Sequence, residues 1–124
     1  MGKPGDVGIR RIVAAARYSL QGFRFAWRNE AAFRQELLLA VLLVPASFWL
    51  GRNALEIAML VATCLFVLIV ELVNSAIEAI VDRVGREHHE LAGAAKDLGS
   101  AAVLLSLLLL GVVWCAVIYS RFLA

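Results

Sequence analysis

The sequence predicts an all-α membrane protein, with an N-terminal amphipathic surface helix followed by three transmembrane helices. The first reason is composition, because 62% of the 124 residues are hydrophobic, against roughly 45–50% in soluble domains. A soluble chain of this length could not bury so much apolar surface, so part of it must face lipid or other subunits. The same composition, with a formal net charge of only +2, argues against nucleic acid as a partner.

The second reason is a set of uncharged apolar runs at residues 37–50, 57–70 and 98–120. A helix needs about 20 apolar residues to cross a bilayer, so the first helix is expected to begin earlier than its uncharged run. The polar stretches at residues 51–53 and 82–97 would connect the spans. The expected transmembrane helices cover about residues 31–50, 54–84 and 97–121, within a single domain of residues 1–124.

The third reason is the segment before the first span, at about residues 6–28. Apolar side chains from Ile9 to Trp27 recur at i, i+3, i+4, i+7 spacing, whereas arginines such as Arg10 and Arg17 lie on the other face. This pattern predicts an amphipathic helix whose cationic face suits an anionic membrane surface. A helix packed on a soluble partner is the alternative interpretation.

The basic residues predict the orientation of the chain. Seven of the 12 lysines and arginines precede the first uncharged run, and three more belong to the second connection. The positive-inside rule then places the N-terminus and this connection in the cytoplasm, and the C-terminus outside. We therefore expect a multi-pass protein of the inner (cytoplasmic) membrane, with any site in this region on its cytoplasmic side.

The second apolar run leads into the stretch "ELVNSAIEAIVD" at residues 71–82, which is unusually polar for a membrane helix. On a helix, its polar side chains fall within an arc of about 100°, a single face; they are Glu71, Asn74, Ser75, Glu78 and Asp82. Glu71 would lie deepest in the apolar layer and Asp82 would meet the cytoplasmic connection. Ionisable groups at such depth commonly mark a functional site, although polar contacts between helices are an alternative.

Carboxylates on this face suit metal-assisted chemistry. A carboxylate in an apolar site takes up a proton readily, as a general base must. Carboxylates nearer water can hold Mg²⁺, which prefers one or two protein carboxylates together with phosphate oxygens. Glu30, Glu36 and Lys96 are expected at the same membrane face, where a lysine could neutralise phosphate charge. The sequence has neither a Walker loop nor a kinase glycine-rich loop, so these residues alone indicate an interfacial site with phosphoryl transfer as the leading reaction.

Three stretches carry a resemblance to a known family: "AWRNEAAFRQE" at residues 26–36, "ELVNSAIEAIVD" at 71–82, and "EHHELAGAAKDLGSAAVL" at 87–104. The chain resembles the prokaryotic diacylglycerol kinase family over nearly its whole length. The resemblance implies a homotrimeric membrane enzyme whose active sites are shared between subunits at the cytoplasmic interface. It also implies transfer of the γ-phosphoryl group of MgATP to diacylglycerol, which yields phosphatidic acid, with Mg²⁺ as cofactor.

The resemblance further implies roles for single residues. Glu71 matches the catalytic base, and Glu30 and Glu78 match the metal-binding carboxylates. The positions that match the nucleotide site are Arg11, Tyr18, Glu30, Glu78, Glu87, His88, His89, Lys96 and Asp97. The positions that match lipid-binding or positioning residues are Arg11, Ser19, Arg34, Gln35, Glu36, Trp49, Glu71, Asn74, Ser100 and Trp114. Leu20 and Ala94 depart from the tryptophan and arginine expected there.

Several other interpretations stay open at this point. An undecaprenol kinase of the same fold would share the phosphate-binding motifs. A small ion carrier could use a ladder of carboxylates, but the acids gather at one membrane face and no inverted repeat is visible. The adjacent His88 and His89 suit a nucleotide contact or a solvated loop better than a shared metal ion. Cys64 and Cys115 lie inside apolar runs, so we expect small core or lipid-facing residues rather than a disulfide.

Overall fold

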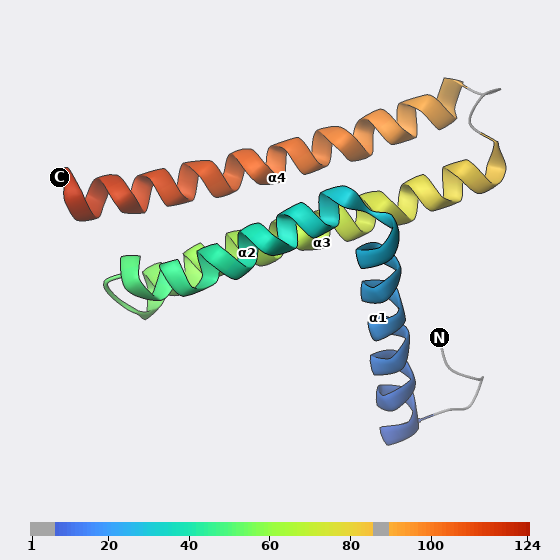
Figure 1. Cartoon of the computed structure of the whole chain (residues 1–124), viewed down its shortest axis with the longest axis horizontal. Helices are drawn as coiled ribbons and strands as arrows, with labels where there is room; N and C mark the ends of the chain where they lie inside the picture. Colours follow the sequence, from blue (N-terminus) through green and yellow to red (C-terminus); the bar gives the residue numbers. More distant parts are fainter. Residues whose placement is uncertain (1–6, 86–89) are drawn as a thin grey trace.

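The computed structural model describes residues 7–85 and 90–124, and these residues form four helices (Figure 1). The helices are α1 (Ile9–Asn29), α2 (Ala31–Leu50), α3 (Ala54–Val84) and α4 (Glu90–Phe122). Helix α3 packs against both α2 and α4, and α1 leaves this bundle at a steep angle. Helices α2, α3 and α4 are each long and apolar enough to cross a membrane, so the chain is an all-helical membrane protein.

The connection between α3 and α4 is shorter than the sequence pattern suggested. We expected the last helix to begin near residue 97, but α4 begins at Glu90. The stretch "ELAGAAKD" is rich in alanine, and its strong helix propensity outweighs its polarity. Helix α3 ends at Val84, where Gly85 takes a φ of 104° that few other residues tolerate. The candidate nucleotide residues Glu87, His88 and His89 fall at 86–89, outside the described residues.

One extended residue, Glu30, forms the corner between α1 and α2. Its backbone has a φ of −119° and a ψ of 103°, and it serves as C-cap of α1 and N-cap of α2. The Arg34 Nη1 donates to the Trp27 carbonyl oxygen at 2.7 Å and to that of Arg28 at 3.4 Å. These carbonyls belong to the last turn of α1, so a cation there also favours the helix dipole. Arg34 therefore fixes the corner that carries Glu30.

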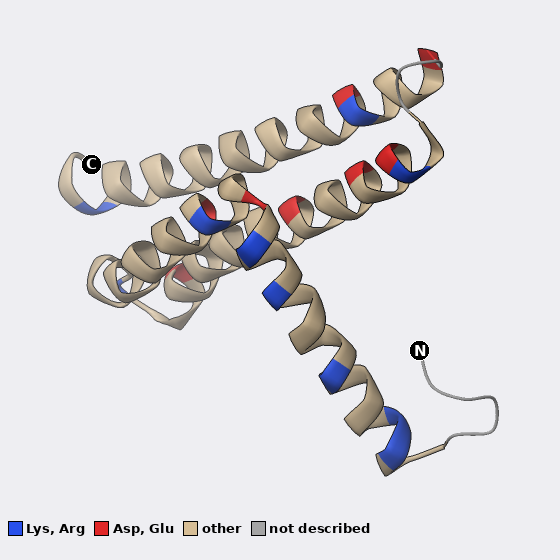
Figure 2. Cartoon of the chain, turned by 45° about the vertical axis from the view of Figure 1, so that its right-hand side comes forward, with Lys and Arg blue, Asp and Glu red and all other residues tan. Residues whose placement is uncertain are grey.

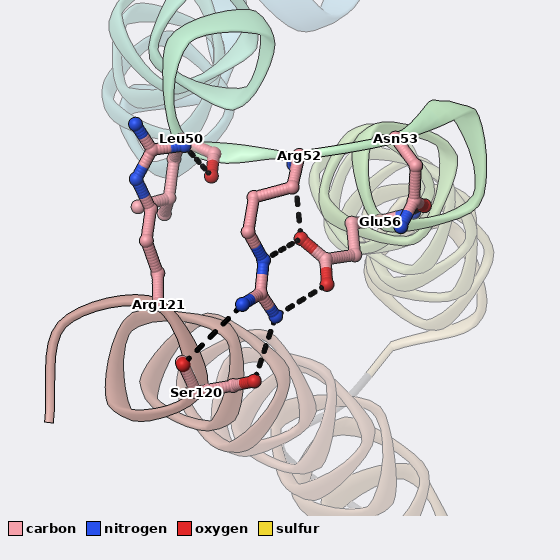
Figure 3. Close-up of polar contacts among 6 residues, drawn as sticks. All are labelled: Leu50, Arg52, Asn53, Glu56, Ser120 and Arg121. Carbon is pink, nitrogen blue, oxygen red and sulfur yellow. Dashed lines mark hydrogen bonds and ion pairs between the residues drawn. The ribbon is translucent and has the colours of Figure 1, made fainter. Parts of the chain in front are cut away.

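Polar contacts join the three helix ends at the opposite end of the bundle (Figure 3). Arg52 Nη2 donates to Glu56 Oε2 at 2.8 Å and to Ser120 Oγ at 2.7 Å. Arg121 Nη1 donates to the Leu50 carbonyl oxygen at 2.9 Å. The hydrogen bond with Glu56 raises the pKa of Arg52 above its ordinary value, and the charge of the same carboxylate adds to this. The arginines of this end thus each have a partner.

The apolar core lies in this same half of the bundle. Its buried members come from α2, α3 and α4, and they are Ala40, Leu50, Leu60, Cys64, Trp114 and Val117. Within the core, Trp114 Nε1 donates to Thr63 Oγ1 at 3.0 Å, and Thr63 Oγ1 donates to the Leu60 carbonyl oxygen at 2.7 Å. Because water is excluded there, the indole N–H depends on this hydroxyl.

We predict that Thr63→Val lowers the free energy of unfolding by about 1–2 kcal/mol, because it keeps the side-chain volume and leaves the Trp114 N–H without an acceptor. The matched control is Ser106→Ala, which removes a buried hydroxyl that bonds only to the Val103 carbonyl of its own helix. Denaturant titration in detergent micelles would measure both. Equal losses in the two variants would contradict the role of the Thr63–Trp114 bond.

Candidate active site at the corner between α1 and α2

Carboxylates from three parts of the chain converge beside α3. Glu71 of α3 is only 3% exposed, and the charges of Glu30 and Glu78 both act on it. Glu36 of α2 lies close enough to Glu71 for that charge to act on it in turn. The extended corner residue and two helices therefore bring four acids into one group, which we call the carboxylate cluster (Glu30, Glu36, Glu71 and Glu78).

The acidic positions of α3 follow one another towards its C-terminal end (Figure 2). Their burial changes along the helix: Glu71 and Asn74 are buried, Glu78 is half-buried and Asp82 is exposed. Asn74 Nδ2 donates to Glu78 Oε1 at 3.3 Å. Asp82 Oδ1 accepts from Lys96 Nζ at 3.0 Å, which joins α3 to α4. The helix thus carries one polar face from the apolar interior to the solvated end of the bundle.

The carboxylate cluster has no ion-pair partner among residues 7–85 and 90–124. Two described cations that could serve the cluster bond elsewhere, because Arg34 contacts the carbonyls of α1 and Lys96 contacts Asp82. Within the same residues, Glu36 Oε2 is buried without a hydrogen bond. Buried like charges repel one another strongly. A bound cation or loss of a charge would relieve that repulsion, and groups arranged in this way are frequent at functional sites.

The donor set fits Mg²⁺ on these grounds. Unpaired carboxylate oxygens are the ligands that a hard divalent cation prefers, and one or two of them suffice when phosphate oxygens complete the shell. In the part of the chain that the structure describes, no group of three or more His, Cys, Asp or Glu side chains could hold a metal by itself. The cluster therefore suits an ion that arrives with a phosphate ligand better than a closed structural metal site.

A groove of about 400 Å³ separates α1 from α3 next to the cluster. Small side chains line much of it, including Ser19, Gly22, Ala26 and Ser75. From the sequence, Ser19 was picked out only by resemblance and Ser75 only as part of the polar face of residues 71–82, and Gly22 and Ala26 were not singled out. The signal was available, because small residues at three- or four-residue spacing on one helix face permit close approach of a neighbour. Ser75 Oγ is buried in this region without a hydrogen bond to any described residue.

A second groove, of about 550 Å³, lies on the side of α1 that faces α2. Its lining is mainly apolar and consists of Leu20, Phe23, Arg24, Trp27, Arg28, Phe33, Leu37 and Leu68. Leu20, one of the two departures from the family pattern, therefore lines an apolar surface beside the corner. Ala94, the other departure, is exposed on α4.

Several residues expected near the lipid or nucleotide lie far from the cluster in this chain. Arg11 and Tyr18 precede Glu30 by 19 and 12 residues of the α1 helix, or about 28 and 18 Å along its axis. Trp49 lies about 28 Å from the corner along α2, where its ring is 6.0 Å from that of Phe122. Trp114 is part of the apolar core. These residues all match positions of the family pattern in the sequence, but within a single chain they lie far from one another.

Other candidate residues on α2 and α4 are neighbours in sequence, but their side chains point to different sides of the helix. Gln35 is exposed, whereas the neighbouring Glu36 faces the cluster. On α4, Gly99 contacts Asn74 of α3. Asp97 precedes Gly99 by two residues, about 200° around the helix, so its side chain points away from α3. Ser100 follows Gly99 by about 100°, and both Asp97 and Ser100 are exposed.

Comparison with known proteins decides the family. A family model described as prokaryotic diacylglycerol kinase matches residues 17–118 of the chain. The chain belongs to the prokaryotic diacylglycerol kinase family. The matched residues include the whole carboxylate cluster, whereas Arg11 precedes residue 17, where the match begins.

Relatives named diacylglycerol kinase match across almost the full length of this family member. The protein of Escherichia coli K12 is 50% identical over 115 residues, which are 93% of this chain and 94% of the relative. That of Pseudomonas aeruginosa is 51% identical over 114 residues, 92% of this chain and 93% of the relative. That of Haemophilus influenzae is 45% identical over 112 residues, 90% of this chain and 95% of the relative.

We predict that Glu71→Gln raises the free energy of unfolding of this family member by roughly 1 kcal/mol when no divalent cation is present, because it removes a buried like charge. The matched control in the same helix is Glu56→Gln, which removes the partner of Arg52 and should lower stability. Thermal unfolding in micelles containing a chelator would measure both. A lower unfolding temperature for Glu71→Gln would contradict repulsion within the cluster.

Proposed function

We propose that the chain is an ATP-dependent diacylglycerol kinase, which transfers the γ-phosphoryl group of MgATP to the free hydroxyl of 1,2-diacylglycerol and yields phosphatidic acid. The observation that carries this proposal is the carboxylate cluster, which has no cation partner among the described residues and lies on a face running from the apolar interior to the solvated end. Family membership supports the same reaction.

Glu71 would accept the proton of the lipid hydroxyl. Its burial supports this role, because a carboxylate shielded from water holds a proton more readily and keeps water from competing with the alcohol. Asn74 would hold Glu78 by its 3.3 Å hydrogen bond and so order the polar face. Lys96 would neutralise charge on the transferring phosphoryl group, once it exchanges Asp82 for phosphate.

Glu30 and Glu78 would hold Mg²⁺. Bound there with ATP, the ion would neutralise charge on the phosphate oxygens. The two carboxylates come from the α1–α2 corner and from α3, and both lie close enough to Glu71 for their charges to act on it. The corner contact of Arg34 would keep Glu30 in this place.

The membrane arrangement follows from the charges. Arginines of α1 are exposed, and we propose that this amphipathic helix lies on the cytoplasmic surface of the inner membrane, with the N-terminus on that side. The cluster at the end of α1 would then stand at the interface. There the hydroxyl of a membrane lipid and ATP from the cytoplasm can meet.

We further propose a homotrimer with active sites shared between subunits. Asp97 and Ser100 belong to the family motif of α4, yet they are exposed and do not face the cluster of their own chain. A neighbouring subunit that presents α4 to the cluster would place such residues around the nucleotide. The same arrangement would bring the exposed Arg11 to a site that its own chain does not complete.

We predict that the purified protein in mixed micelles transfers label from γ-labelled MgATP to diacylglycerol, and that Glu71→Gln lowers the rate about 10²–10⁴-fold, the usual contribution of a general base. Undecaprenol would be offered separately. Label on undecaprenol alone would retain the chemistry and overturn the proposed substrate. Label on neither lipid, with folded trimeric protein, would overturn the kinase proposal in favour of a carrier.

We predict that Glu30→Gln raises the Mg²⁺ concentration needed for half-maximal activity roughly tenfold, because one of two carboxylate ligands is lost. The control is Glu90→Gln, an exposed acid in the first turn of α4, which should leave the Mg²⁺ requirement unchanged. Activity measured across a Mg²⁺ titration separates the two. An unchanged requirement in Glu30→Gln would remove Glu30 from the metal site.

A further inference from the structure

The backbone of Gly99 on α4 lies so close to the side chain of Asn74 on α3 that no residue with a Cβ would fit at position 99 without displacing it. A Cβ built on Gly99 would collide with Asn74 Oδ1, and it would lie 3.2 Å from Asn74 Cγ. Gly99 is itself buried, as is Asn74. The lack of a side chain at position 99 therefore gives Asn74 the space that its amide occupies.

This contact accounts for an otherwise orphaned atom. Asn74 Oδ1 is buried without a hydrogen-bond donor among the described residues. The glycine hydrogen points to where the Cβ would stand, so the oxygen lies against a Cα–H group, a weak but recurrent donor at helix interfaces. With its oxygen held there, the amide presents Nδ2 to Glu78 Oε1 at 3.3 Å. The two contacts together fix which way the amide faces.

We propose that Gly99 is a positioning residue of the active site, which acts by holding the Asn74 amide in the orientation that orders Glu78. This inference rests on the proposed kinase function for its catalytic consequence. Gly99 would touch neither substrate nor metal, and its effect would pass entirely through Asn74.

A substitution at Gly99 should disturb the site and leave the fold intact. The obstructing atom is the far end of a side chain, which can rotate, rather than backbone. A groove of about 170 Å³ adjoins both residues and is lined further by Ile69, Val70, Val73, Ile77 and Ala102. A displaced Asn74 can turn into this groove. It would then lose its bond to Glu78, and one of the two proposed metal ligands would lose its support.

The test compares Gly99→Ala with Gly111→Ala, another glycine of α4, where an added Cβ meets nothing within 4 Å. Both changes raise helix propensity equally. We expect Gly99→Ala to keep its thermal stability, to lower kcat roughly tenfold with less change in the KM for lipid, and to require more Mg²⁺, as loss of a hydrogen bond to a charged group predicts. Gly111→Ala should resemble the wild type. Equal activities for the two variants would overturn the proposal.

A double-variant cycle separates positioning from general packing. In an Asn74→Ser background the obstructed amide is absent, so Gly99→Ala should lower kcat less than about twofold further. An undiminished loss in that background would show that Gly99 acts by another route. It would overturn the proposed path through Asn74.

A readout independent of activity follows the amide itself. Asparagine-selective ¹⁵N labelling in micelles would reveal the Asn74 side-chain NH₂ signal, which Asn74→Ser assigns by its loss. The signal should move in Gly99→Ala and stay in place in Gly111→Ala. An unmoved signal in both would overturn the inference. Absence of lipid phosphorylation by the wild type would instead overturn the proposed function, a failure that the spectrum distinguishes from failure of the Gly99 contact.

Discussion

The repulsion between the buried Glu71 and the half-buried carboxylates around it is the constraint on which the polar half of this molecule depends. Glu71 is almost fully buried, and the charges of Glu30 and Glu78 act on it. An apolar medium magnifies such repulsion, so the cluster opposes folding unless a cation or a proton offsets it. Among residues 7–85 and 90–124 no side chain supplies that cation, because Arg34 bonds to the end of α1 and Lys96 bonds to Asp82. The proposed MgATP would offset this repulsion by placing its metal ion among the carboxylates.

The two ends of the bundle differ in how their charged side chains are partnered. At the end opposite the carboxylate cluster, Arg52 bonds to Glu56 and Ser120, and Arg121 bonds to the Leu50 carbonyl. The core with its Trp114 bond lies in the same half. Stability is therefore concentrated away from the cluster. Such a division permits a strained polar site, because the packed half holds the helices while the other half keeps its charges available.

Much of this organisation could be predicted from the sequence, because it depends on faces of single helices. Uncharged runs predicted the long apolar helices, and a 100° spacing predicted one polar face on α3. Relations between helices were harder. The sequence did not reveal that α4 begins at Glu90, that Gly99 accommodates Asn74, or that Trp114 lies in the core. These features depend on which helices pack together and on how far they are shifted along their axes. The periodicity within a single helix encodes neither.

The graded burial of α3 explains why one helix could serve both reactants of the proposed transfer. The hydroxyl of a membrane lipid lies at the membrane interface, and ATP approaches that interface from the aqueous side. The two reactants can therefore meet only there. Along α3 the side-chain environment passes from the buried Glu71 through the half-buried Glu78 to Asp82. At about 1.5 Å per residue, Glu71 and Glu78 stand roughly 10 Å apart along the axis. A base at one depth and a metal ligand at the other would then match the separate origins of alcohol and phosphate, with Asn74 between them holding the metal ligand Glu78.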